Sequence, residues 1–487
     1  MNRCLAGLLA FSLCSLAQQP AKTATEPAKL IAITNVDIVD VEAGSTVPNQ
    51  TVLIADGKIL LVGNPLNTAI PKDALRISGR DKYLMPGLWD MHVHVAGVTA
   101  RPEWGKQLLP VYLAYGITGV RDMGGDLQAL KEWRRAASVI PGPEMIVAGP
   151  FVDASADGYA SPKEVIAVKT PLEARAAVRK IKADGANFIK IGSRLTRELY
   201  FAIADETGKM NMAFLGHVPD SVPVDEASFS GMGSMEHLFG VMLACSSKSA
   251  ELRQRLKDAK DRSERAKIAD EVEATFSETV AMELFSHFAE RNTYQVPTLV
   301  WTRNTSTLDK ASSNDPGLQY IPEALRKEWT PANADKFVSA AGRAYYQRKL
   351  KQDLKLISLM NKAGVPLMAG SDSLDPFVFP GDSLHSELEL LVSAGLTPGQ
   401  ALRTATLNAA RFMGRERTLG EVKGGKAADL VLLDADPLKD IRNTRKISAV
   451  FSKGRHYSRA DLDKLLHDAA VSFGSSPTTP SPASTTK

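Results

Sequence analysis

The middle of the chain alternates short apolar runs with amphipathic helical stretches, and this alternation limits the possible folds more than any other feature. Helical stretches such as "PLEARAAVRKIKADG" and "SELELLVSAG" separate the apolar runs, as expected for repeated strand-helix units. Eight such units favour an α/β fold, a parallel sheet closed into a (β/α)8 TIM barrel. The predicted strands are 83–94, 116–122, 144–150, 187–192, 211–218, 234–239, 294–301 and 365–372.

The two ends of the chain are rich in β-forming residues instead. Residues 30–82 contain "LIAITNVDIVDV" and "TVLIADGKILLVG", and Asp56-Gly57 inside the second run is a hairpin-turn signal. Residues 414–458 contain "KAADLVLLDADP" and "ISAVFSKGRHYS", which have the same character. We therefore predict a small β-sandwich domain built from both segments, beside a barrel domain at 83–413. A chain of 487 residues that is 44% hydrophobic can form both cores.

Three further segments are predicted outside these cores. Residues 241–290 and 302–360 are charged and mostly helical, which indicates helices outside the barrel with solvated faces. Residues 459–487 are predicted as a C-terminal helix followed by a disordered tail, because "SSPTTPSPASTTK" cannot bury a core.

The N-terminus indicates export. Arg3 precedes a short apolar run that ends in a small-x-small pattern at Ala17, and the run is too short for a stable bilayer span. We predict a signal peptide at 1–17, cut after about Ala17, then a polar linker at 18–29, and hence a secreted or periplasmic protein. A buried first helix is the alternative. Lipid anchoring through Cys14 is disfavoured, because the residue before it is larger than such processing usually requires.

Cysteine and charge composition exclude some classes of protein. Cys4 and Cys14 lie in the predicted signal peptide, so Cys245 alone cannot form an internal disulfide. The net charge of +4 comes from 59 basic and 55 acidic residues without a basic block, so nucleic acid is not an expected partner. No later segment is predicted to span a membrane, and a homo-oligomer is left open.

Two histidines lie on the first predicted barrel strand. Strand side chains alternate between two faces, so in "MHVHV" His92 and His94 share one face and Met91, Val93 and Val95 share the other. The apolar set is expected to pack under the helices. Both imidazoles are therefore predicted to point into the barrel.

Four more polar residues lie on later predicted strands. By the same alternation Lys190 points inward, where an unpaired ammonium would be costly. His217, His237 and Asp372 lie near the C-terminal ends of their strands, where such barrels place active sites. Singly, each has a structural explanation, such as a helix N-cap or a buried ion pair. Together, five strands deliver imidazole and carboxylate to one mouth, which predicts a site for zinc or a related divalent ion.

The motifs together resemble the amidohydrolase superfamily, in particular its imidazolonepropionase-like branch with Xaa-Pro dipeptidases and ochratoxin-hydrolysing amidases. The resemblance runs from about Leu30 to Ser458. It is carried by "YLMPGLWDMHVH", "GITGVRDMG", "GANFIKI", "GHV", "MEHL", "KAGVPLMAGSD" and "GEVKGGKAADLVLLDADPL". These motifs are specific to the superfamily and much less specific to a substrate.

The resemblance implies a site for two divalent metal ions, with zinc the favoured metal. Its ligands would be His92 and His94 on the first ion, His217 and His237 on the second, a carbamate on Lys190 bridging both, and Asp372 on the first ion. Asp372 would also be the general base. Single-metal members of the branch need no bridging lysine.

The activity implied by the resemblance is hydrolysis of an amide or peptide C–N bond by a secreted binuclear amidohydrolase. The attacking group would be a metal-activated hydroxide, and the substrate a small molecule such as an Xaa-Pro dipeptide or an N-acyl amino acid. A mononuclear hydrolase or deaminase of a cyclic substrate, with Lys190 only structural, is the alternative. A non-catalytic ligand-binding barrel is the third and least favoured hypothesis.

Such substrates carry a free carboxylate, which needs a cationic or hydroxyl partner at the mouth. Tyr159 follows the third predicted strand, and Arg194 and Arg197 follow Lys190, so these are candidate substrate-binding residues. For each, a solvated loop residue is the alternative. His385, which opens "HSELELLV", is a fourth candidate, although a structural role in capping its helix is favoured.

Overall fold

The computed structural model describes most of the chain. The described residues are 30–97, 102–136, 140–157 and 163–475. The predicted signal peptide and linker, Tyr159 and all but the first residue of the low-complexity tail lie outside them.

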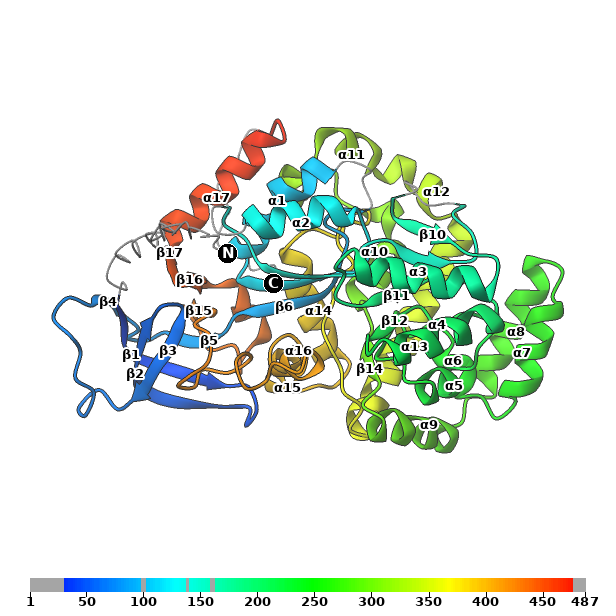
Figure 1. Cartoon of the computed structure of the whole chain (residues 1–487), viewed down its shortest axis with the longest axis horizontal. Coiled ribbons are helices and arrows are strands. Elements are labelled where there is room, and N and C mark those ends of the chain that lie inside the picture. The colour runs from blue at the N-terminus through cyan, green and yellow to red at the C-terminus, as the bar shows by residue number, and fades with distance from the viewer. Residues whose placement is uncertain (1–29, 98–101, 137–139, 158–162, 476–487) are drawn as a thin grey trace, which may run out of the picture.

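Segments from both ends of the chain form one eight-stranded sheet, which lies beside the larger helical part of the molecule (Figure 1). The strand order is β17-β16-β15-β5-β1-β2-β3, with β4 paired to β1. The strands are β1 (Ile31–Asp40), β2 (Ser45–Ala55), β3 (Lys58–Gly63), β4 (Leu75–Ser78), β5 (Tyr83–Pro86), β15 (Leu430–Leu433), β16 (Ile447–Ser452) and β17 (Arg455–Ser458). Asp56 and Gly57 join β2 to β3 with φ of 50° and 71°, which suits a tight hairpin.

A single stretch of chain serves both the small sheet and the barrel. The predicted strand 83–94 is divided at Gly87, because β5 pairs with β1 and β15 whereas β6 (Leu88–Val93) pairs with β7. The Gly87 N–H donates to the carbonyl of Asp429 at 2.8 Å. A Cβ atom at Gly87 would lie 2.1 Å from Oγ1 of Thr118, so the backbone passes too close to β7 for any side chain.

The barrel forms as predicted, with helices around a ring of parallel strands. Its strands are β6, β7 (Ile117–Asp122), β8 (Glu144–Val147), β11 (Ile189–Ile191), β12 (Phe214–Gly216), β13 (Ser234–Glu236), β14 (Tyr294–Val296) and the eighth predicted segment. The short strands β9 (Phe151–Asp153) and β10 (Val165–Ala167) lie beside β11.

Backbone hydrogen bonds close this ring at the two places where regular pairing is interrupted. Between β8 and β11, the N–H of Asn187 donates to the carbonyl of Val147 at 2.8 Å. The eighth segment has only isolated bridges, yet Met368 donates to Gln295 at 2.9 Å and Ala369 accepts from Met91 at 3.0 Å. The segment therefore joins β14 to β6. The predicted fold class, a barrel with a small sheet domain from both ends, is confirmed.

The seventh predicted strand, 294–301, is too long. β14 ends at Val296 and a helix begins at Leu299. Pro297 lacks the N–H that would continue the strand ladder, and Thr298 adopts a left-handed φ of 47° that turns the chain.

Helices surround the barrel, and the charged segments at 241–290 and 302–360 are helical as expected (Figure 1). The helices are α1 (Pro102–Ala114), α2 (Leu127–Ala136), α3 (Pro171–Ala183), α4 (Arg197–Lys209), α5 (Val224–Phe229), α6 (Val241–Ala244), α7 (Ser249–Asp258), α8 (Arg262–Ala274), α9 (Glu278–Glu290), α10 (Leu299–Ser306), α11 (Glu323–Glu328), α12 (Ala334–Phe337), α13 (Ala340–Lys362), α14 (Asp382–Ser393), α15 (Pro398–Thr404), α16 (Leu407–Phe412) and α17 (Arg459–Ser472), with short 3-10 helices at Leu308–Lys310, Pro316–Tyr320, Pro331–Asn333 and Ile441–Arg445. The C-terminal helix α17 packs against α1.

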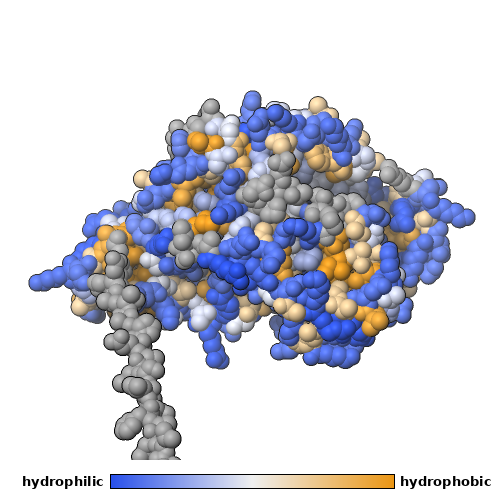
Figure 2. Space-filling model, turned by 45° about the horizontal axis from the view of Figure 1, so that its top comes forward, coloured by the Kyte–Doolittle hydropathy of each residue, from blue (hydrophilic) through white to orange (hydrophobic). Residues whose placement is uncertain are grey.

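The surface carries both hydrophilic and hydrophobic side chains. Figure 2 shows hydrophilic side chains over most of one face, with smaller hydrophobic areas between them. Within the described ranges, no helix combines the length and the apolar character needed to cross a membrane.

The close approach at Gly87 gives a stability prediction. We expect Gly87→Ala to lower the free energy of unfolding by about 1–3 kcal/mol, because the new methyl group overlaps the buried Thr118. Gly208→Ala in α4 is the matched control, since a Cβ there meets nothing within 4 Å, and it should raise stability by about 0.5–1 kcal/mol. Denaturant unfolding of both variants measures the difference, and equal stability of the two would contradict the argument.

Candidate metal centre

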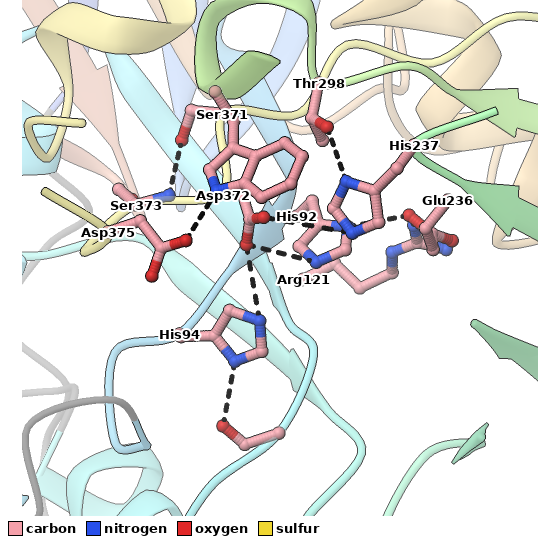
Figure 3. A network of polar contacts seen from close by, with 12 residues as sticks. His92, His94, Arg121, Glu236, His237, Thr298, Ser371, Asp372, Ser373 and Asp375 are labelled. Atoms are coloured by element: carbon pink, nitrogen blue, oxygen red, sulfur yellow. Dashed lines mark hydrogen bonds and ion pairs between the residues drawn. The ribbon is translucent and has the colours of Figure 1, made fainter. Parts of the chain in front are cut away.

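Four histidines and an aspartate converge at the C-terminal ends of the barrel strands, and Figure 3 shows three of them, His92, His94 and His237, around Asp372. His92 lies on β6 and His94 just beyond it, while His217 and His237 directly follow β12 and β13. The ring centres of His92 and His237 are 4.8 Å apart, those of His217 and His237 are 4.9 Å apart, and those of His92 and His94 are 5.4 Å apart. Asp372 ends the eighth segment.

Asp372 lies among three of these rings. Its Oδ1 atom is 3.3 Å from Nε2 of His92 and 3.4 Å from Nε2 of His94, and its Oδ2 atom is 3.8 Å from Nε2 of His237. Asp372 and His237 have φ of 64° and 62°, a left-handed conformation that is uncommon outside glycine. The surrounding structure therefore holds both side chains at the cost of backbone strain, which is typical of functional sites.

The alternation predicted for "MHVHV" is correct for Val93 and Val95 but wrong for Met91. Val93 and Val95 belong to the large core cluster that includes α1, whereas Met91 belongs to a separate cluster with Trp89, Val296 and Met368 of the barrel and with Ala409 and Ala410 of α16. The register of β6 against β7 is irregular between Asp90 and Val93, as in a β-bulge. A bulge adds a residue and resets the alternation, so Met91 does not share the face of Val93.

The outer ring nitrogens of His92 and His237 are held by acceptors. Nδ1 of His92 donates to a carboxylate oxygen of Glu236 at 2.8 Å. The hydroxyl of Thr298 donates to the carbonyl of Pro297 at 2.8 Å, so its oxygen accepts from Nδ1 of His237 at 2.7 Å. Both rings therefore carry the proton on Nδ1 and present an unprotonated Nε2 to the cluster.

His94 and His217 follow the same pattern. Nδ1 of His94 lies 3.3 Å from the carbonyl of Gly124, and Nδ1 of His217 lies 2.9 Å from the hydroxyl of Ser193. All four imidazoles are thus fixed through Nδ1 by partners outside the cluster. This is the usual arrangement of histidines that bind a metal ion through Nε2.

Burial keeps most of these rings neutral. It is the main cause that lowers the pKa of His92, His217 and His237 well below the ordinary value, and the charge of Lys190 contributes. Burial would also lower the pKa of His94, but contact with Asp372 outweighs it and raises the pKa. Neutral imidazole is the form that binds metal ions.

Lys190 lies on β11 with 2% of its surface exposed, and its Nζ atom has no hydrogen-bond partner. Burial lowers the pKa of Lys190 to about 8, against the opposing attraction of Glu236 and Asp372. A buried amine without a partner is costly. This position therefore favours a modified lysine or an ion beside it.

A buried ion pair between Arg121 and Glu236 holds the ring of His92 through a hydrogen bond, and it was not predicted from the sequence. Arg121 on β7 donates to both carboxylate oxygens of Glu236 at 3.0 Å, to Oγ of Ser234 at 2.9 Å and to the carbonyl of Met91 (Figure 3). Arg121 and Glu236 are fully or almost fully buried. Two adjacent charged residues at the end of a predicted barrel strand, Arg121 and Asp122 in "GITGVRD", are the signal that could have identified Arg121.

The remaining described candidates have polar partners of their own. Arg194 is exposed and donates to the carbonyl of Asp157 at 2.6 Å. Arg197 opens α4 and forms an ion pair with Glu226. His385 is buried in α14, where its ring nitrogens contact the hydroxyl of Thr444 and the carbonyl of Tyr115, both at 2.9 Å.

The donor set fits a divalent metal ion. One ligand atom each from His92, His237 and Asp372 lies within 4.8 Å of the others. Nε2 of His92 has no hydrogen-bond partner although it is buried, as expected for an atom that faces an ion. Imidazole nitrogen and carboxylate oxygen are the usual ligands of zinc.

The chain is similar to known proteins in both sequence and fold. Residues 83–456 match the sequence profile of the Amidohydrolase family. Ochratoxinase from Aspergillus niger is 24% identical over 88% of this chain and 87% of its own. Among solved structures, bottromycin amidohydrolase has a TM-score of 0.69 at 23% identity and covers 93% of this chain and 92% of its own. A Xaa-Pro dipeptidase with bound methionine has a TM-score of 0.63 at 20% identity and covers 88% of this chain and 100% of its own.

The buried ion pair gives a second prediction. Glu236→Gln leaves the guanidinium of Arg121 buried without its counter-charge, so we expect a loss of about 3–5 kcal/mol in the free energy of unfolding of the metal-free protein. Metal affinity should fall by about 10–100-fold as well, because His92 loses its carboxylate partner. Glu42→Gln is the control, since its exposed pair with Arg411 should contribute no more than about 1 kcal/mol. Equal losses in the free energy of unfolding of the two variants would show that the buried pair contributes no more to stability than the exposed pair.

Proposed function

Because the chain belongs to the amidohydrolase family, we propose that it is a binuclear metal-dependent enzyme that hydrolyses an amide or peptide C–N bond of a small substrate. The observation that carries the proposal is a cluster of four imidazoles, each held through Nδ1, with three of them around Asp372 and the unpartnered amine of Lys190 close enough to influence their charge.

A site with two ions uses more of these potential ligands than a site with one ion. His92 and His94 would hold the first ion together with Asp372, and His217 and His237 would hold the second. Lys190, once carbamylated by carbon dioxide, would supply an anionic oxygen to both. Carbamylation requires a neutral amine, and the lowered pKa of about 8 makes that form accessible near neutral pH. Zinc is the metal we propose on ligand chemistry.

The chemistry follows from this ligand set. Divalent ions bound here would lower the pKa of a water molecule and polarise a substrate carbonyl. Asp372 is suited to the proton transfer. Burial would raise its pKa, but the hydrogen bond from His94 and the charges of His94 and Lys190 lower it below the usual range, so the carboxylate is ionised. We propose that Asp372 accepts the proton of the attacking water on a carboxylate oxygen and returns it to the leaving nitrogen.

For the substrate we propose a small amide such as an Xaa-Pro dipeptide or an N-acyl amino acid, as the names of the similar proteins suggest. Arg194 and Tyr159 stay candidates for binding a substrate carboxylate. Arg197 is a weaker candidate because Glu226 already neutralises it, and both ring nitrogens of His385 are engaged. For His385 we therefore propose a structural role between α14 and its neighbours.

One observation favours a second candidate function, a mononuclear hydrolase or deaminase. Ligand atoms of His92, His237 and Asp372 already lie close enough together to share one ion. In that case Lys190 would be structural. A non-catalytic binding barrel is less favoured, because such a protein needs no ionised carboxylate next to the imidazoles.

The variant Lys190→Ala distinguishes the binuclear from the mononuclear function. We expect the wild type to bind about two metal ions per chain and to hydrolyse part of a panel of Xaa-Pro dipeptides and N-acyl amino acids. The variant should bind about one ion or fewer and lose at least about a hundredfold in turnover, because the bridge is gone. Elemental analysis and steady-state kinetics measure both, and Lys257→Ala on the exposed face of α7 is the control.

Each alternative function has its own outcome in this experiment. Full activity of Lys190→Ala with one ion would favour the mononuclear site. A metal-loaded wild type that hydrolyses no amide would overturn the proposed function.

We also propose that the enzyme is exported. The support is the sequence of residues 1–17, with Arg3, the apolar run and the small-x-small pattern at Ala17. On expression of the full chain we expect the product in the periplasm or medium to begin at about Gln18, which N-terminal sequencing measures. An uncut N-terminus, or protein confined to the cytoplasm, would refute export.

A further inference from the structure

Three aromatic side chains border the metal-ligand cluster on the side of His237. The ring of Phe239 lies 5.5 Å from that of His217 and 5.0 Å from that of His237. The ring of Trp301 lies 5.0 Å from His237, and Tyr346 lies 5.2 Å from Trp301. We call Phe239, Trp301 and Tyr346 the aromatic wall.

The aromatic wall is built outside the barrel strands. Phe239 follows β13, Trp301 lies on α10 after β14, and Tyr346 lies on α13. Helices α10 and α13 pack against each other. In barrels of this kind the segments after the strands carry substrate specificity, while the strand ends carry the chemistry.

All three rings are half-buried, whereas His92, Glu236 and His237 beside them are buried. The wall therefore lies at the border between the closed cluster and solvent, where a substrate must enter. Partly exposed aromatic rings next to convergent polar groups are the usual composition of a ligand pocket.

Specific contacts fix the wall in place. Nε1 of Trp301 donates to the carboxylate of Asp375. Nζ of Lys349 lies 5.4 Å from the centre of the Phe239 ring, and it also donates to the carbonyl of His237 at 2.6 Å. The charge of Lys349 is balanced by Asp353 at 2.7 Å. A wall held this way is formed before a ligand arrives, so little ordering cost opposes binding.

The wall selects for a neutral occupant. The ammonium of Lys349 already lies over the ring of Phe239, so a cation of the ligand cannot make a second cation–π contact on that side of the ring. A planar aromatic group instead gains edge-to-face or offset contacts with Trp301 and Phe239.

We propose that the aromatic wall binds an aromatic side chain of the amide substrate and so makes the enzyme selective for aromatic amides. This inference rests on the proposed function, which supplies the amide bond placed at the metal ligands. Phe239, Trp301 and Tyr346 are then specificity-determining residues, and none of them takes part in the bond cleavage.

The first test uses the metal-loaded wild-type enzyme and matched substrate pairs. Phe-Pro is compared with Ala-Pro, and N-acetyl-phenylalanine with N-acetyl-alanine, so that the ring is tried on either side of the bond. We expect kcat/KM to favour the aromatic member of at least one pair by about tenfold or more. Calorimetric binding of the same four compounds to the metal-free protein gives a readout independent of turnover.

The two measurements separate the inference from the proposed function. Hydrolysis without preference for the ring would overturn the inference alone. Tighter binding of the aromatic members without any hydrolysis would overturn the proposed function and leave the wall in place. Absence of both preference and hydrolysis would overturn both.

Substitutions of the three wall residues test whether the aromatic wall causes this preference. Phe239→Leu and Tyr346→Leu should each reduce the aromatic preference, the ratio of kcat/KM for the aromatic substrate to that for its alanine partner, by about tenfold. Trp301→Phe keeps a ring and should keep most of the preference, whereas Trp301→Leu should lose it. Phe229→Leu is the control, because this ring is 70% exposed on α5 and lies over Arg291. An unchanged preference in every wall variant would refute the assignment.

Discussion

The candidate site depends on one buried charge pair. The carboxylate of Glu236 accepts from the guanidinium of Arg121 and from Nδ1 of His92, and these residues come from β13, β7 and β6. Taking two charges out of water is costly unless each is neutralised and hydrogen-bonded, and here both conditions are met. The pair in turn dictates which nitrogen of His92 carries the proton. The position of the proton on His92, a residue of the barrel mouth, is therefore set by a charge pair buried in the barrel.

Sequence alone predicted the parts of the structure that follow from periodicity. The eight strand positions, the small sheet from both chain ends and the external helices all follow from apolar spacing, and the family resemblance supplied the candidate ligand residues. Periodicity failed where the backbone departs from regular pairing. The bulge in β6 separates Met91 from Val93, and Pro297 ends β14 early. The bulge leaves no mark on the hydrophobic pattern, whereas Pro297 is a strand-ending signal in the sequence that apolar spacing alone does not use.

The supporting residues were harder to predict for a different reason. Glu236 and His237 are consecutive, and simple alternation would send them to opposite faces of β13. The left-handed backbone at His237 lets both residues contribute to the site. His237 belongs to the cluster, and Glu236 contacts His92 from outside it. Partners such as Thr298 and Ser193 contribute single hydroxyl groups from loops, and a sequence offers no signal that distinguishes them from any other loop hydroxyl. Only the packed chain brings them to the rings.

The passage of β5 into β6 through Gly87 also constrains how the chain can assemble. One neighbour of β5 in the sheet is β1, which is synthesised just before it, but the other is β15, which follows the whole barrel in the chain. Until β15 is made, β5 has an open edge of unpaired backbone groups. The small sheet thus starts before the barrel and is completed only after it, and a nascent or truncated chain carries that exposed edge until β15 has been made.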